Sequence, residues 1–150
     1  MLVSQVSGHN VVSVSTAETV ARVDQFLVDP GTRSIVAVTV KKAASGSVLR
    51  WTDLTAMGPD AVTVSGPDRI TGPDDRLTRL ADKHRRPIGK RVLDAGGDEL
   101  GEVSDIDFDP HTGAVQALLV NDQRVAGDRL IGIGSWAVVV AVAEDEPAPL

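Results

Sequence analysis

Three aspartates, Asp105, Asp107 and Asp109, stand at every second position of the stretch DIDFDPHTG. Carboxylates at this spacing open the calcium loop of an EF-hand, which also needs Gly at its sixth position and a bidentate Glu at its twelfth. Counted from Asp105, those positions hold Pro110 and Gln116, so the calcium loop is incomplete.

The same alternation is typical of a β-strand with one buried face. It places Ile106 and Phe108 in the core and the three acids on the solvent face. We therefore predict a strand running into a turn, and weak calcium binding at the surface remains the alternative.

Other motifs give little support for catalysis. The segment GIGSWA, residues 132–137, fits the G-x-G-x-x-A spacing of a dinucleotide-binding turn, but a strand-like Val run follows it where that motif needs a helix. His9, His84 and His111 have no second ligand at i+2 or i+4, and no serine stands in a G-x-S-x-G elbow. We expect a protein that is not an enzyme and that has no cofactor and no metal site.

One cluster of basic residues stands out, DKHRRP at residues 82–87, with Lys83, Arg85 and Arg86. At the end of a short helix these cations would complement the negative end of the helix dipole and stay in water. The other interpretation is a small electrostatic contact with nucleic acid or with an acidic partner.

Charge is distributed unevenly along the 150 residues, whose net charge is −6. Residues 88–150 carry four basic and twelve acidic groups, a net charge of −8. Binding to a phosphate backbone depends on clustered Lys and Arg, so this balance argues against nucleic acid as the main partner.

The composition also bears on the compartment. The absence of cysteine excludes disulfides and thiolate metal sites, and it fits a reducing environment. No apolar stretch approaches the ~18 residues that read as a membrane span, and the first residues lack a signal-peptide pattern. We expect a soluble cytoplasmic protein without membrane insertion, and the preference for Arg over Lys points to a GC-rich bacterial genome.

Two parts of the sequence repeat each other at an offset of 80 residues. Residues 23–40, VDQFLVDPGTRSIVAVTV, align with residues 103–120, VSDIDFDPHTGAVQALLV, and six of the eighteen positions are identical. Upstream, GHNVVS matches GKRVLD, and downstream, LTAMGPDAVTV matches LIGIGSWAVVV. A duplication is the simplest explanation.

Each copy is predicted to consist of short strands separated by turns, which is typical of a small barrel or sandwich rather than a βαβ fold. In the second copy we expect strands near residues 91–94, 100–109, 114–121, 123–126 and 137–143, and a turn at 130–134, matching a turn at 54–58 in the first copy.

Between the copies, Pro73 followed by Asp74 and Asp75 predicts the start of a short helix. Leu77, Leu80, Ala81 and His84 would share one face of it.

The predicted fold class is all-β, with two tandem small barrels joined by a linker that contains a short helix. Repeat 1 covers residues 1–64, the linker 65–84 and repeat 2 85–143. The acidic, Pro-containing tail at 144–150 is expected to be disordered.

The order of these motifs resembles the PRC-barrel family. A Gly-led strand, a second strand of the LGEV type, an Asp-Pro-x-Thr hairpin, a Val-rich third strand and the stretch WTDLTAMGPDAVTV carry the resemblance, as two tandem copies over nearly the whole chain. The family is named after the H subunit of the photosynthetic reaction centre, and the ribosome maturation factor RimM carries a related C-terminal domain. The resemblance implies a small PRC-type β-barrel used for docking and assembly, without a catalytic signature.

The third strand of each copy is apolar on both faces, although a small barrel has only one interior. Either the linker helix or the termini cover the second face, or these faces pack the two repeats or two chains together, which we favour. The predicted interface residues are Leu27, which stands where the second copy has Asp107, and Val36, Val38, Val40, Leu118 and Val120.

We therefore expect a non-catalytic interaction or assembly module with an unidentified protein partner, present as a homodimer or as two repeats packed on each other. One alternative is a ribosome- or RNA-associated factor, which the resemblance to RimM and the residues Lys83, Arg85 and Arg86 suggest. Another is a sensor of a small ligand or a metal.

Overall fold

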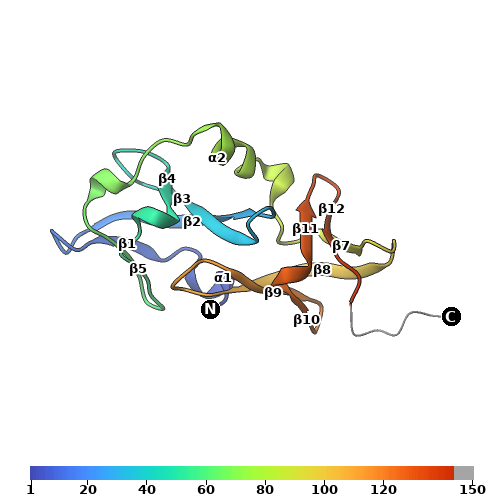
Figure 1. Ribbon diagram of the computed structural model, residues 1–150. Helices are drawn as coiled ribbons and strands as arrows, with labels where there is room; N and C mark the ends of the chain where they lie inside the picture. Colours follow the sequence, from blue (N-terminus) through green and yellow to red (C-terminus); the bar gives the residue numbers. More distant parts are fainter. Residues whose placement is uncertain (144–150) are drawn as a thin grey trace.

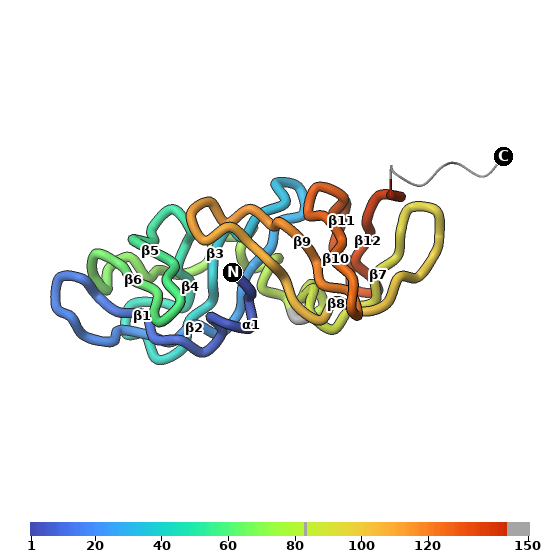
Figure 2. The backbone as a smooth tube through the Cα atoms, turned by 90° about the horizontal axis from the view of Figure 1, so that it is seen from below, coloured from blue at the N-terminus to red at the C-terminus, as the bar shows by residue number. Residues whose placement is uncertain are grey.

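The computed structural model describes residues 1–143, apart from the side chain of Lys83, so the predicted tail at 144–150 lies outside the described residues. The all-β prediction is confirmed, because the strands of residues 1–143 form two six-stranded sheets. The N-terminal half, blue to green, and the C-terminal half, yellow to red, lie side by side (Figure 1). Seen from below, the N-terminus lies between them (Figure 2).

The two sheets have the same connectivity. The N-terminal sheet has the order β4-β3-β2-β1-β6-β5, and the C-terminal sheet has the order β10-β9-β8-β7-β12-β11. In both, the first strand pairs in parallel with the last strand of its half, and the other neighbours are antiparallel. The strands are β1 (Asn10–Ser13), β2 (Thr19–Asp29), β3 (Ser34–Lys41), β4 (Val48–Arg50), β5 (Ala56–Met57), β6 (Val62–Val64), β7 (Arg91–Asp94), β8 (Glu99–Phe108), β9 (Val115–Val120), β10 (Gln123–Ala126), β11 (Leu130–Ile133) and β12 (Ala137–Val140).

Corresponding strands also pair in the same register. Val12 lies opposite Thr63 in the β1–β6 pair, and Leu93 lies opposite Val139 in the β7–β12 pair. A bulge between the first two strands recurs at the corresponding place in both halves. The repeat seen in the sequence therefore corresponds to two sheets of the same topology and register.

One expectation about the strands is wrong. The structure places the strand β11 where the sequence predicts a turn at 130–134, and the corresponding stretch 54–58 contains β5. Both strands are short and owe their conformation to antiparallel pairing with β12 and β6. A run of four residues such as LIGI is too short for its alternation to be recognised.

The linker contains three short helical elements, the 3-10 turn η2 (Pro67–Arg69), the helix α2 (Asp75–Leu80) and the 3-10 turn η3 (Lys83–Arg85). The carboxylate of Asp74 accepts a hydrogen bond from the N–H of Leu77 at 2.8 Å, which confirms the predicted helix start. Among the described residues, no helix is long and apolar enough to cross a membrane.

The helix α2 covers one face of the N-terminal sheet. Its Leu77 packs with Leu27, Ala37 and Val48 in a small separate core. His84 does not share this face, because α2 ends at Leu80 and His84 is exposed in η3. Part of the second apolar face of β3, the third strand of the N-terminal copy, is therefore covered by the linker.

The main core continues from one half of the molecule to the other. The ring centroid of Phe108, from β8, lies 5.6 Å from that of Phe26 on β2 and 6.1 Å from that of Trp51, which packs edge-on. Trp51 begins the 3-10 turn η1 (Trp51–Asp53). Because Phe108 is fully buried between residues of the other half, the two halves share one core.

The turns of the β2–β3 and β8–β9 hairpins pair with each other at the junction. The N–H of Ile35 donates to the carbonyl of Gly113 at 2.8 Å, and the N–H of Val115 donates to the carbonyl of Arg33 at 2.9 Å. Residues 33 and 35 correspond to 113 and 115 in the repeat, so the two bonds are related by the internal symmetry.

The side chains at this symmetric contact differ. Gly113 adopts a φ of +80°, and a Cβ placed there would lie 3.0 Å from the Trp51 ring. The corresponding residue of the other hairpin is Arg33, whose Nε donates to the carbonyl of Leu130 at 2.9 Å. The position that corresponds to Trp51 holds Gly127, the first residue of the 3-10 turn η4 (Gly127–Arg129). The positions of Trp51 and Arg33 in the N-terminal half are thus both occupied by glycine in the C-terminal half, at Gly127 and Gly113.

Candidate functional site

The aspartates that resemble a calcium loop bind the N-terminal residues. Asp105 accepts a hydrogen bond from the backbone N–H of Ser4 at 3.1 Å and a second one from the Ser4 hydroxyl. Asp107 accepts from the α-amine of Met1 at 3.0 Å and from Arg124 at 2.7 Å. Both carboxylates therefore serve a structural contact with the other end of the chain.

The strand interpretation of this stretch is confirmed in part. Ile106 and Phe108 are buried as predicted, and Asp109 accepts a hydrogen bond from the N–H of His111 at 2.8 Å in the following turn. The predicted solvent exposure is wrong for Asp105, which is only 8% exposed. Within residues 1–143, no group of three or more His, Asp and Glu residues is placed to hold a metal ion.

The contacts of Asp107 predict a pH dependence of stability. Burial opposes its ionisation, but Arg124 and the Met1 α-amine outweigh this effect and lower the pKa of Asp107 below its usual 3.8. A carboxyl whose pKa is lower in the folded than in the unfolded protein stabilises the fold when it is ionised. This contribution is fully present above the pKa of the unfolded state, and it is lost as the pH falls through the pKa of the folded state. The free energy of unfolding should therefore fall less in Asp107→Asn than in the wild type between about pH 6 and about pH 3.

Urea unfolding at a series of pH values measures this difference. Asp122→Asn, on the exposed turn between β9 and β10, is the matched control for removing a carboxylate of the same half. If Asp107→Asn follows the wild type at every pH, the contact with Met1 and Arg124 does not stabilise the fold.

The remaining motifs of the sequence are dispersed over the molecule. Residues 132–137 contain the end of β11, a short turn and the first residue of β12, so a strand follows the glycines where a dinucleotide-binding motif needs a helix. Arg85 and Arg86 are exposed, but α2 ends before the basic cluster begins, so these cations do not lie at a helix end. His84 and His111 are exposed, whereas His9 is half-buried.

Each half is preceded by a leading segment, residues 1–7 and residues 82–88, that lies against the other half. Gly8 and Gly89, with φ of +83° and +88°, connect these segments to β1 and β7. The first segment contains the helix α1 (Val3–Val6) and packs on β8 through the bonds to Asp105. The second segment passes β2 and lines a cavity together with it. The two leading segments therefore cross over between the halves.

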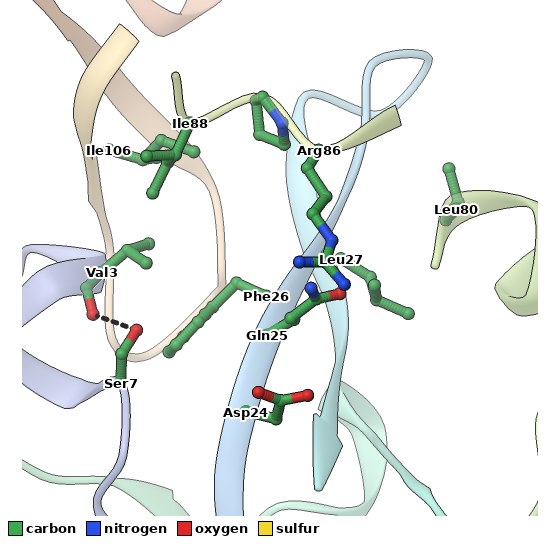
Figure 3. Close-up of a pocket in the computed structure, with 11 residues that line it drawn as sticks. Val3, Ser7, Asp24, Gln25, Phe26, Leu27, Leu80, Arg86, Ile88 and Ile106 are labelled. Atoms are coloured by element: carbon green, nitrogen blue, oxygen red, sulfur yellow. Dashed lines mark hydrogen bonds between the residues drawn. The ribbon is translucent and has the colours of Figure 1, made fainter. Parts of the chain in front are cut away.

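This cavity, of about 250 Å³, lies where the two leading segments meet. Figure 3 shows Ile88 and Ile106 close together on one side and Arg86 extended toward Gln25. With its amide oxygen turned toward Arg86, Gln25 accepts hydrogen bonds from that guanidinium. Asp24, which also lines the cavity, pairs with Lys41 at 3.4 Å. The charged groups around the cavity thus already have partners within the chain.

The predicted interface residues are mostly buried within the chain. Val38, Val40, Leu118 and Val120 belong to the core that continues through both halves. Leu27 lies under α2, and the half-buried Val36 packs beside it.

A different surface, on the outside of the C-terminal sheet, exposes apolar side chains. Trp136 is 61% exposed and Ile131 is 52% exposed. The guanidinium of Arg91 lies 4.5 Å from the centre of the Trp136 ring, and the half-buried Leu93 and Val139 pair beside it in register. We call this surface the outer face, defined by Arg91, Leu93, Ile131, Trp136 and Val139.

The matching surface of the N-terminal sheet is polar. The repeat alignment and the identical strand registers place Asn10, Val12, Thr55, Asp60 and Thr63 at the positions of the outer face. Four of these five residues are polar, whereas four of the five on the C-terminal sheet are apolar or aromatic. The sequence alone contained this signal, because a comparison of the two copies position by position would have revealed it.

In the comparison with known proteins, a family model matches the C-terminal half. No curated protein matches the chain. Residues 82–145, which include the whole C-terminal sheet and its leading segment, match the family model of the PRC-barrel domain.

Proposed function

We propose that the protein is a pair of tandem PRC-type barrels, at 1–64 and 85–143, that acts as a non-catalytic interaction and assembly module. The identical strand order and register of the two sheets support a second copy in the N-terminal half. The two copies share one core and exchange their leading segments, so they would present their surfaces to a partner as one unit.

The observation that carries the proposal is the outer face. An exposed tryptophan and an exposed isoleucine on one hairpin are costly to keep in water and are typical of a protein-binding surface. The N-terminal sheet shows that the same fold is compatible with polar residues at these positions, so stability of the barrel does not require Trp136 or Ile131.

Site-specific photo-crosslinking in cells tests this function. Benzoylphenylalanine replaces Trp136 in one variant and the corresponding Asp60 in the matched control, and the thermal midpoint of each variant confirms folding. We expect a discrete crosslinked adduct from position 136 and none from position 60. Adducts of equal yield at both positions, or none at 136, would contradict the proposal.

The alternative of a ribosome- or RNA-associated factor rests on the resemblance to RimM and on Lys83, Arg85 and Arg86. The guanidinium of Arg86 is bound to Gln25 at the junction cavity, and the C-terminal half carries an excess of acids, so the outer face supports a protein partner better.

A further inference from the structure

We infer that the outer face binds an apolar segment of another protein that carries Lys or Arg, with these cations reaching Glu99 and Glu102. This inference rests on the proposed function and names the chemistry of the partner. It follows from the residues around the outer face, from the edge of the sheet and from the charge of the C-terminal half.

Acidic residues border the outer face along β8. Glu102 pairs in register with Arg91, and Glu99 pairs with Leu93, so both glutamates lie beside the outer face. Both are exposed. The Arg91 guanidinium contacts Glu99 at 3.5 Å, whereas no ion pair between described residues involves Glu102. Glu102 is therefore the charge most available to a partner.

The polar counterpart in the N-terminal half lacks this acidic border. The registers place Arg22 where the C-terminal half has Glu102, and Thr19 where it has Glu99. The N-terminal counterpart carries one cation, Arg22, and one acid, Asp60, so a basic segment would be attracted to the outer face more than to its counterpart. Such a charge difference between two otherwise equal surfaces is a means of directing a partner to one of them.

The charges also disfavour other occupants. Residues 88–143 carry nine acidic and four basic groups, so a second copy of the chain, docked by the same surface, would bring acids against acids. Nucleic acids and anionic membranes present phosphates and meet the same repulsion. A partner segment with apolar and basic side chains complements both features of the outer face.

The partner docks on the face rather than on the strand edge. The edge strand on the side of the outer face is β11, and the carbonyl of its first residue, Leu130, already accepts a hydrogen bond from Arg33 at 2.9 Å. Strand addition at this position would break that contact with the N-terminal half. The exposed side chains of Ile131 and Trp136 also favour docking on the face of the sheet.

A random library of displayed dodecapeptides tests the inference. The intact protein is the bait, and the double variant Ile131→Thr with Trp136→Asp, which carries the residues of the N-terminal half, is used for counter-selection. We expect the enriched peptides to combine aliphatic residues with Lys and Arg at about twice the input frequency. Peptides enriched in acidic residues, or in apolar residues without cations, would overturn the inference.

The variant Glu102→Arg, which also carries the residue of the N-terminal half, tests the role of charge. The dissociation constant of an enriched peptide should rise about tenfold in Glu102→Arg, and the effect should weaken at high salt. Asp122→Arg is the matched control on the turn between β9 and β10 and should leave the constant unchanged. An equal change in both variants would show long-range attraction without a defined contact and would refute the inference.

These outcomes separate the two proposals. Crosslinking at position 136 without selection of basic peptides would overturn the inference and leave the interaction function standing. The absence of both would remove the function as well.

Discussion

Replacing Phe108 with alanine will lower the free energy of unfolding by about 3–5 kcal/mol, the cost of removing a fully buried aromatic side chain. Phe108 lies between Phe26 and Trp51 of the other half, so the cavity opens inside the shared core, where neither sheet can close it alone. We expect this variant to be among the least stable single substitutions of the chain.

Urea unfolding followed by circular dichroism and by tryptophan fluorescence measures the loss. Trp136→Ala is the control, because it removes a larger side chain from the surface and should cost less than about 1 kcal/mol, the contribution of an exposed cation–π contact. The wild type should unfold in one transition by both signals. Two separate transitions, or a loss in Phe108→Ala no larger than in the control, would show that the halves are independent.

Gly113→Ala is the second substitution with a large expected effect, about 2–5 kcal/mol. The left-handed backbone at φ +80° costs about 1–2 kcal/mol for a residue with a Cβ. The new Cβ would also lie 2.7 Å from the carbonyl oxygen of Ile35 and 3.0 Å from the Trp51 ring, and such overpacking costs about 1–3 kcal/mol.

Gly97→Ala separates the two causes. Gly97 has a φ of +91° on the β7–β8 turn, and a Cβ there would have no neighbour within 4 Å. Its substitution should therefore show the backbone cost alone, again about 1–2 kcal/mol. If the free energy of unfolding falls equally in the two variants, the groups around Gly113 move aside without an energetic penalty, and the junction is not tightly packed.

Local features of the fold were predictable from the sequence. The helix start at Pro73–Asp75 follows from residues adjacent in the chain. The strands at 91–94 and 123–126 have the predicted bounds, because turn residues flank them. The repeat then extends the same fold to the N-terminal half.

Features that depend on distant residues were not predictable. The alternation around Asp105 indicates a surface strand, and nothing nearby in the sequence shows that Ser4 will cover it. Likewise, the two apolar faces of the third strand require a cover. The sequence offered the linker helix and the other repeat as alternatives, and only the structure shows that both contribute.

The outer face is a different case. Read within one copy, its exposed residues Ile131 and Trp136 lie in or next to a predicted turn and do not stand out as a surface patch. Only the contrast between Trp136 and Asp60, at equivalent positions, separates a binding residue from a core residue.

The crossed leading segments bear on how the protein is made. Residues 1–7 are synthesised well before β8, yet Ser4 binds Asp105, 101 positions later in the chain. Val3 and Val6, buried in the finished molecule, must stay without their final contacts until β8 has been synthesised. A fold with such a high contact order forms slowly, because a long loop closes before its contacts are gained. Folding is therefore completed only after synthesis of the second copy, and a chain truncated before β8 would expose the apolar side of α1.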